Sequence, residues 1–177
     1  MNEFRRKVAG AVSFAFVLSG VLLYGTSAAW AQQKASPAQK QIVGVWSLVS
    51  STNTGADGVA GASSFGPNPK GMLIYTSSGH FTSVNTNPSI PKFASGNRLQ
   101  GTAEENKAVV QGSNASFGTY SISADGKVIT HKVEGGTWAN WVGTEQKRDL
   151  ALAGDEMKAS FSSTRGGKSV LAYKRVK

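Results

Sequence analysis

The chain has 177 residues, of which 40% are hydrophobic, a formal net charge of +9 and no cysteine. This length suits one domain, and the lack of cysteine excludes disulfides. The basic residues are scattered apart from a cluster at Lys174, Arg175 and Lys177, whereas a nucleic-acid-binding protein typically has a concentrated basic stripe with interleaved aromatics. We therefore expect no nucleic-acid partner. The charge favours solubility and a weak attraction to anionic envelope surfaces.

Residues 1–31 have the pattern of a secretory signal peptide. Residues 5–7 are basic, residues 8–24 form an uncharged and mostly apolar run, and Ala29-Trp30-Ala31 is a small-x-small processing site. We expect cleavage after Ala31 and a mature protein that is periplasmic or secreted, with a net charge lowered from +9 to +7 by the loss of Glu3 and residues 5–7. An uncleaved anchor is the alternative, because the apolar run just reaches the lower limit for a spanning helix.

The remaining chain predicts short strands. Residues 32–41 are a polar lead-in, and Pro37 suits the first turn of a short helix that ends near Val43. Eight runs then alternate with a period of two, at 45–51, 71–77, 80–85, 116–123, 127–134, 144–152, 156–163 and 168–176. Tight-hairpin signals such as Asp125-Gly126 connect several of them, which predicts an all-β antiparallel barrel or sandwich.

Three segments do not follow this pattern. Residues 102–110 predict one further helix, with Thr102 and Glu105 as a capping box. Residues 52–69 and 86–101 are long connections that contain Gly, Ser and Pro. Connections of this length are typically lids, binding loops or disordered segments.

Strand alternation predicts which side chains face the interior. In 127–134, His131 shares a face with apolar residues, and in 144–152 Gln146 and Arg148 do the same, so we expect all three to point inward. Two further inner faces are predicted at Met157, Ala159 and Phe161, and at Leu171, Tyr173 and Arg175. In 71–77 the pattern leaves two assignments open, either Leu73 with Tyr75 or Met72 with Ile74.

Arg148 is the strongest candidate for a ligand-binding residue, because an inward guanidinium is costly to leave unpaired. It could hold a ligand carboxylate with two hydrogen bonds. Alternatively, it could pair with Glu134 or Asp149 inside the fold, or extend its charged end to the rim.

His131 is the second candidate. A single histidine on an apolar strand face is typical of a core residue bonded to a tyrosine or a backbone carbonyl, although it could also serve as a general acid or base. With two histidines and no cysteine, the chain has too few ligands for zinc, and we expect neither a metal nor a cofactor. Trp138 and Trp141 lie between two predicted strands, where they could cap a cavity or pack in the core.

The strand ends carry a family resemblance. Gly44-Val45-Trp46 opens the first strand after a short helix, and Arg175 lies at the end of the last strand. This arrangement resembles the lipocalins and the wider calycin group, in which a tryptophan of the first strand closes one barrel end beneath a basic residue of the last strand. Further motifs at 44–50 (GVWSLVS), 69–75 (PKGMLIY), 117–120 (FGTY) and 130–148 are similar to the bacterial and fungal lipocalin-like domain family.

The resemblance implies a single eight-stranded, mostly antiparallel barrel over residues 42–177, closed by Gly44, Trp46 and Arg175. We expect the cavity to bind a small hydrophobic molecule with an acidic or carbonyl group, through Tyr75, Tyr120, His131, Trp138, Trp141, Gln146, Arg148 and Phe161. Two alternatives remain: a barrel enzyme of the isomerase, cyclase or hydratase type that uses His131 and Arg148, and an envelope interaction module with a filled barrel. A binding protein is the favoured interpretation.

Overall fold

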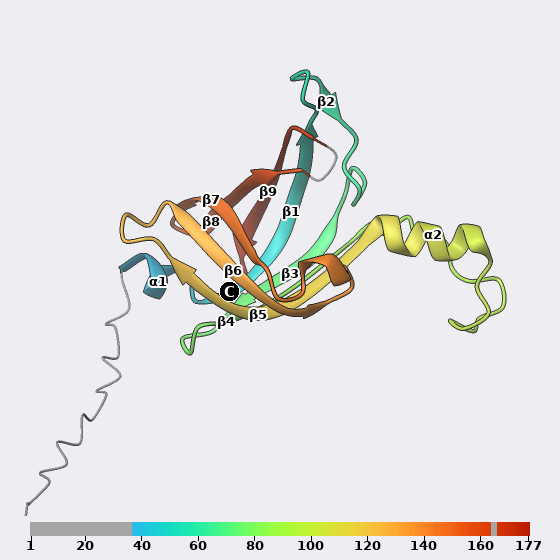
Figure 1. Cartoon of the computed structure of the whole chain (residues 1–177), viewed down its shortest axis with the longest axis horizontal. Coiled ribbons are helices and arrows are strands. Elements are labelled where there is room, and N and C mark those ends of the chain that lie inside the picture. The colour runs from blue at the N-terminus through green and yellow to red at the C-terminus, as the bar shows by residue number, and fades with distance from the viewer. Residues whose placement is uncertain (1–36, 164–165) are drawn as a thin grey trace, which may run out of the picture. The chain divides into compact units, whose positions relative to one another are not determined.

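Eight strands pair in chain order and close on themselves in the computed structural model, which describes residues 37–163 and 166–177 (Figure 1). Each strand is antiparallel to its neighbours, and pairing between the first and last strands completes the barrel. They are β1 (Gly44–Thr54), β3 (Lys70–Tyr75), β4 (His80–Thr86), β5 (Ser113–Ile122), β6 (Val128–Gly136), β7 (Glu145–Ala153), β8 (Glu156–Ser162) and β9 (Lys168–Arg175). The predicted eight-stranded antiparallel barrel is confirmed.

One short strand was not predicted. β2 (Ala60–Gly61) pairs with Asn53 and Thr54 at the far end of β1. β1 itself continues to Thr54, because Thr52 and Thr54 pair with β9 opposite Val170 and Lys168. The Gly- and Ser-rich connection is therefore shorter than the predicted 52–69.

The two predicted helices are present as α1 (Pro37–Ile42) and α2 (Ala103–Gly112). The capping box of α2 is complete: the Glu105 amide donates to Thr102 Oγ1 at 3.2 Å, and the Thr102 amide donates to Glu105 Oε2 at 2.8 Å. No helix within residues 37–163 and 166–177 is long and apolar enough to cross a bilayer.

The strand faces follow the predicted alternation. His131 on β6 is 4% exposed and lies between the buried Ile129 and Val133. On β3 the open assignment is resolved, because Leu73 and Tyr75 are each 2% exposed whereas Met72 is 48% exposed. The interior therefore contains apolar residues together with a histidine and several tyrosines.

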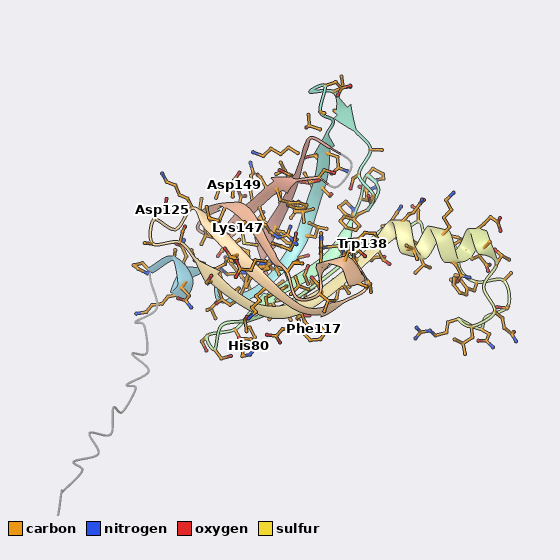
Figure 2. The ribbon with its side chains drawn as sticks, viewed as in Figure 1. His80, Phe117, Asp125, Trp138, Lys147 and Asp149 are labelled. Carbon is orange, nitrogen blue, oxygen red and sulfur yellow. The ribbon has the colours of Figure 1, made fainter. Side chains whose placement is uncertain are left out.

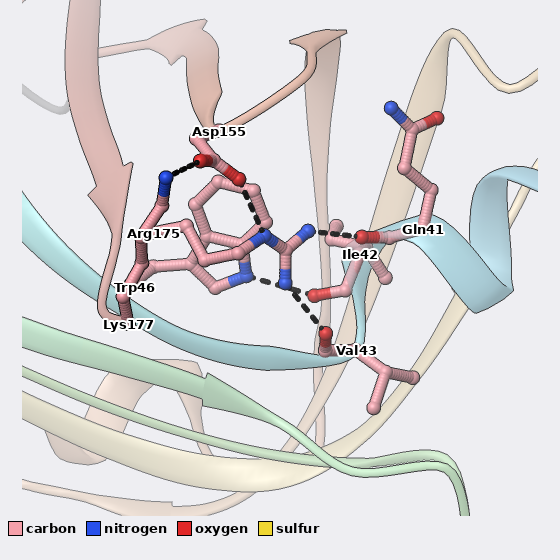
Figure 3. A network of polar contacts seen from close by, with 7 residues as sticks. All are labelled: Gln41, Ile42, Val43, Trp46, Asp155, Arg175 and Lys177. Atoms are coloured by element: carbon pink, nitrogen blue, oxygen red, sulfur yellow. Dashed lines mark hydrogen bonds and ion pairs between the residues drawn. The ribbon is translucent and has the colours of Figure 1, made fainter.

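A network around Trp46 closes one end of the barrel (Figure 3). The Arg175 guanidinium lies 4.2 Å from the centre of the fully buried Trp46 ring, and it donates to the carbonyls of Val43 and Gln41. The indole Nε1 donates to the Ile42 carbonyl at 2.8 Å. These bonds connect β1 and the last strand to the end of α1 and to Val43, the residue after it.

Gly44 is required beside this network. Its φ of +136° lies in a region that disfavours other residues, and a Cβ there would come within 2.7 Å of Arg175 Nη1. The small residue therefore leaves room for the guanidinium to reach the backbone carbonyls.

The predicted signal peptide, its cleavage site and residues 32–36 of the lead-in lie outside the described residues. All described elements belong to one unit, Lys34–Lys177.

Candidate functional site: a cavity inside the barrel

A cavity of about 490 Å³, including the part open to solvent, lies inside the barrel. Its apolar lining consists of Phe65, Leu73, Trp141, Ala159, Phe161 and Leu171. Its polar lining consists of Tyr75, Ser83, Asn85, Asn114, Ser116, His131, Arg148 and Tyr173. Arg148 is the one charged residue among these described lining residues.

Arg148 projects from β7 into this cavity, next to two aromatic rings. Its guanidinium carbon lies 4.3 Å from the Phe161 ring centre and 5.8 Å from that of Trp141. Its Nε donates a long hydrogen bond of 3.4 Å to His131 Nδ1. Burial lowers the pKa of Arg148 from its usual value, while the neighbouring Tyr173 and Tyr75 raise it. A guanidinium remains charged at neutral pH even so.

No carboxylate neutralises Arg148 in the part of the chain that the structure describes. The ion pairs there join Lys168 to Asp149, and Arg175 and Lys177 to Asp155. Asp149 was a predicted partner of Arg148, but it lies on the outer face of β7 (Figure 2). Glu134, the other predicted acid, is exposed on β6. The reason is strand alternation, which directs residues 147 and 149 away from the face that holds Arg148.

His131 is enclosed by its neighbours. Its Nε2 lies 2.7 Å from the Tyr75 hydroxyl, and its ring stacks on Phe81 with centroids 4.0 Å apart and planes at 15°. Burial, and then the charge of Arg148, hold the pKa of His131 well below its ordinary value. The imidazole is therefore neutral at physiological pH, with both ring nitrogens in hydrogen bonds.

This depressed pKa predicts a loss of stability in mild acid. Because the unfolded histidine binds a proton near pH 6.5 and the folded one does not, the free energy of unfolding should decrease as the pH falls below about 6.5. The contribution of one histidine is at most about 1.4 kcal/mol per pH unit. Urea unfolding between pH 7.5 and 5 should show this decrease.

The two histidines provide matched variants for that measurement. His131→Gln should reduce the decrease, whereas His80→Gln should leave it unchanged, because His80 is exposed near a hairpin (Figure 2). Equal pH profiles for wild type and His131→Gln would contradict the assignment.

The tyrosines of the cavity are neutral as well. Burial raises the pKa of Tyr75 well above its ordinary value and that of Tyr173 to about 12, although the charge of Arg148 opposes both shifts. Side-chain hydrogen bonds with Asn85 and Ser83 also act to lower the Tyr173 pKa. The cavity therefore combines one cation with neutral phenols, amides and hydroxyls.

Sequence comparison identifies the family of this barrel. The model of the lipocalin-like domain family matches residues 43–176, which is most of the chain. The chain belongs to the lipocalin-like domain family. No curated protein matches it.

Solved structures show limited similarity to this lipocalin-like protein. A lipocalin-like protein from Bacteroides uniformis is 13% identical with a TM-score of 0.42, and the match covers 77% of this chain and 99% of that chain. A redesigned β-barrel has the same identity and TM-score, with 80% and 97% covered. A mutant of the fluorescent protein UnaG is 15% identical with a TM-score of 0.38, with 77% and 97% covered. Similarity at this level carries no conclusion about what this lipocalin-like barrel binds.

Five of the eight predicted ligand-binding residues line the cavity of the lipocalin-like barrel: Tyr75, His131, Trp141, Arg148 and Phe161. The other three are not among its described lining residues. The Tyr120 hydroxyl donates to the Thr76 carbonyl at 2.9 Å, and Gln146 Nε2 donates to Thr144 Oγ1 at 2.7 Å. Trp138 is 45% exposed.

Other lining residues of the lipocalin-like barrel were not predicted as ligand contacts. Ala159, Leu171 and Tyr173 lie on predicted inner faces, so alternation alone could have identified them. On β4, Ser83 and Asn85 face inward together with the buried Phe81, while Val84 is 49% exposed, so a rule that points apolar residues inward gives no single face there. Phe65 comes from the connection after β2, where no periodic pattern marks it.

Proposed function

We propose that this protein is exported and that it binds a small, largely apolar organic anion inside the barrel. The observation that carries the proposal is Arg148, whose cation faces the cavity without a carboxylate partner among the described residues. A buried charge without a counter-ion is costly, and an anionic ligand would remove that cost. The proposal of export rests on the signal-peptide pattern of residues 1–31.

The surroundings of Arg148 suit an apolar ligand body. Phe65, Trp141 and Phe161 supply aromatic surface, and Leu73 and Leu171 add aliphatic surface. Pockets with apolar walls and a few convergent polar groups are typical of small-molecule sites.

The space favours a compact ligand. The centre of a water molecule can move through only about 50 Å³ of the cavity, which is enough for a few waters. A larger ligand would require lining side chains, such as that of Trp141, to move. Because the space is limited, the experiment must also test the alternative, an interaction module whose barrel is filled by its own side chains.

His131 supports binding rather than catalysis. A general base needs a lone pair directed at the substrate, but Nδ1 of His131 accepts from Arg148 and Nε2 contacts Tyr75. The net charge of +7 expected for the mature chain is consistent with a weak attraction of the protein to anionic envelope surfaces, and this would require no specific site.

Native mass spectrometry of the protein purified from its own cells, followed by organic extraction, tests the proposal. We expect a bound small acid, and we expect the apo protein to bind benzoate but not methyl benzoate, which has a similar ring but no charge. An apo mass together with no response to a panel of aromatic and aliphatic acids would support the filled barrel. Equal affinity for the acid and its ester would contradict the role of the anion.

A further inference from the structure

The hydrogen bonds of His131 determine which of its nitrogens carries the proton. The Nε–H of Arg148 can only donate, and it points at His131 Nδ1, so Nδ1 must offer its lone pair. The proton of the neutral ring is then on Nε2, and Nε2–H donates to the Tyr75 oxygen at 2.7 Å. The opposite tautomer would place two N–H groups head to head.

The tautomer leaves the hydroxyl hydrogen of Tyr75 unused. The Tyr75 oxygen accepts from His131, so its own hydrogen must find another acceptor, and it forms no further hydrogen bond within residues 37–163 and 166–177. Tyr75 is 2% exposed and lines the cavity. A buried donor without an acceptor is unfavourable, and a ligand oxygen in the cavity would satisfy it.

Arg148 and Tyr75 contact the two different nitrogens of the His131 ring, and both line the same cavity. Arg148 has five N–H donors and uses one of them on His131. The terminal N–H groups of Arg148 and the Tyr75 hydroxyl are therefore both available to acceptors in this cavity.

We propose that Tyr75 is a second anchor for the ligand, and that His131 positions its hydroxyl. The proposal rests on the anion-binding function proposed above and specifies the ligand as a compact carboxylic acid, bound as its carboxylate. One carboxylate oxygen accepts from the Tyr75 hydroxyl, and the group as a whole accepts from Arg148. A carboxylate has the two oxygens that this pair of donors needs, whereas chloride supplies a single centre and no apolar body.

Benzoate binding to the whole mature protein tests this assignment, by calorimetry in chloride-free buffer and again with added chloride. Tyr75→Phe should weaken benzoate binding about ten- to hundredfold, because a hydrogen bond to a charged group is lost. Tyr120→Phe is the matched comparison and should weaken it less, since the Tyr120 hydroxyl already donates to the Thr76 carbonyl. His131→Gln can retain a donor to Tyr75 and should bind benzoate more tightly than His131→Leu.

The tautomer provides a readout that needs no ligand. The ¹⁵N chemical shifts of His131 in the free protein should show protonated Nε2 and unprotonated Nδ1 at pH 7. Protonated Nδ1, or equal benzoate affinity in wild type and Tyr75→Phe, would overturn the role of Tyr75 while leaving the anion-binding function intact. Chloride binding without benzoate binding would overturn the carboxylate assignment, and failure of every acid to bind would overturn both proposals.

Discussion

Arg148→Met is expected to abolish carboxylate binding while leaving the free protein at least as stable as the wild type. Binding should weaken by a hundredfold or more, because the cation of the cavity is removed. The free energy of unfolding should be unchanged or higher by up to about 2 kcal/mol, because a buried charge is costly while methionine fills similar volume. Calorimetry with benzoate and urea unfolding measure the two effects.

Lys147→Met is the matched control for this variant. Lys147 is the neighbouring residue on β7, but it is exposed on the outer face (Figure 2), so the substitution removes the same charge without changing the cavity. We expect little change in either measurement. If Arg148→Met instead lowered the free energy of unfolding by several kcal/mol, Arg148 would stabilise the barrel itself. The proposal that it is present to bind an anionic ligand would then be wrong.

Arg175→Met should clearly destabilise the closed end of the barrel. The substitution removes the cation from the Trp46 ring and leaves the carbonyls of Val43 and Gln41 without their donor. A loss of about 2–4 kcal/mol follows from one cation–π contact and two backbone acceptors. The midpoint of urea unfolding should shift, with little change in slope.

Lys177→Met distinguishes the contribution of the Trp46 network from that of the ion pairs with Asp155. Lys177 also pairs with Asp155, at 3.1 Å, but its side chain is 84% exposed. Exposed ion pairs contribute little, so the substitution should change stability by less than about 1 kcal/mol. Similar losses in the two variants would show that the ion pair with Asp155 matters more than the cation over Trp46.

Local sequence patterns were sufficient to predict the eight strands of the barrel, though not the short β2. Their period of two comes from backbone geometry, so 127–134 and 144–152 predicted the inward faces of His131 and Arg148 that the structure shows. The helix cap at Thr102 was predicted for the same reason, because its bonds join residues three positions apart. At β4 the pattern leaves the inner face open, because the apolar Phe81 and Val84 lie on opposite faces of the strand.

The sequence by itself determined the barrel class, the family and the inward direction of Arg148, since each depends on local periodicity or on short motifs. Only the tertiary structure decided which partners these side chains have. It brings Tyr75 of β3 to His131 of β6, separates Arg148 from the acids of neighbouring positions, and adds Phe65 to the lining. Such contacts depend on strand register and barrel closure, which join residues far apart in the chain.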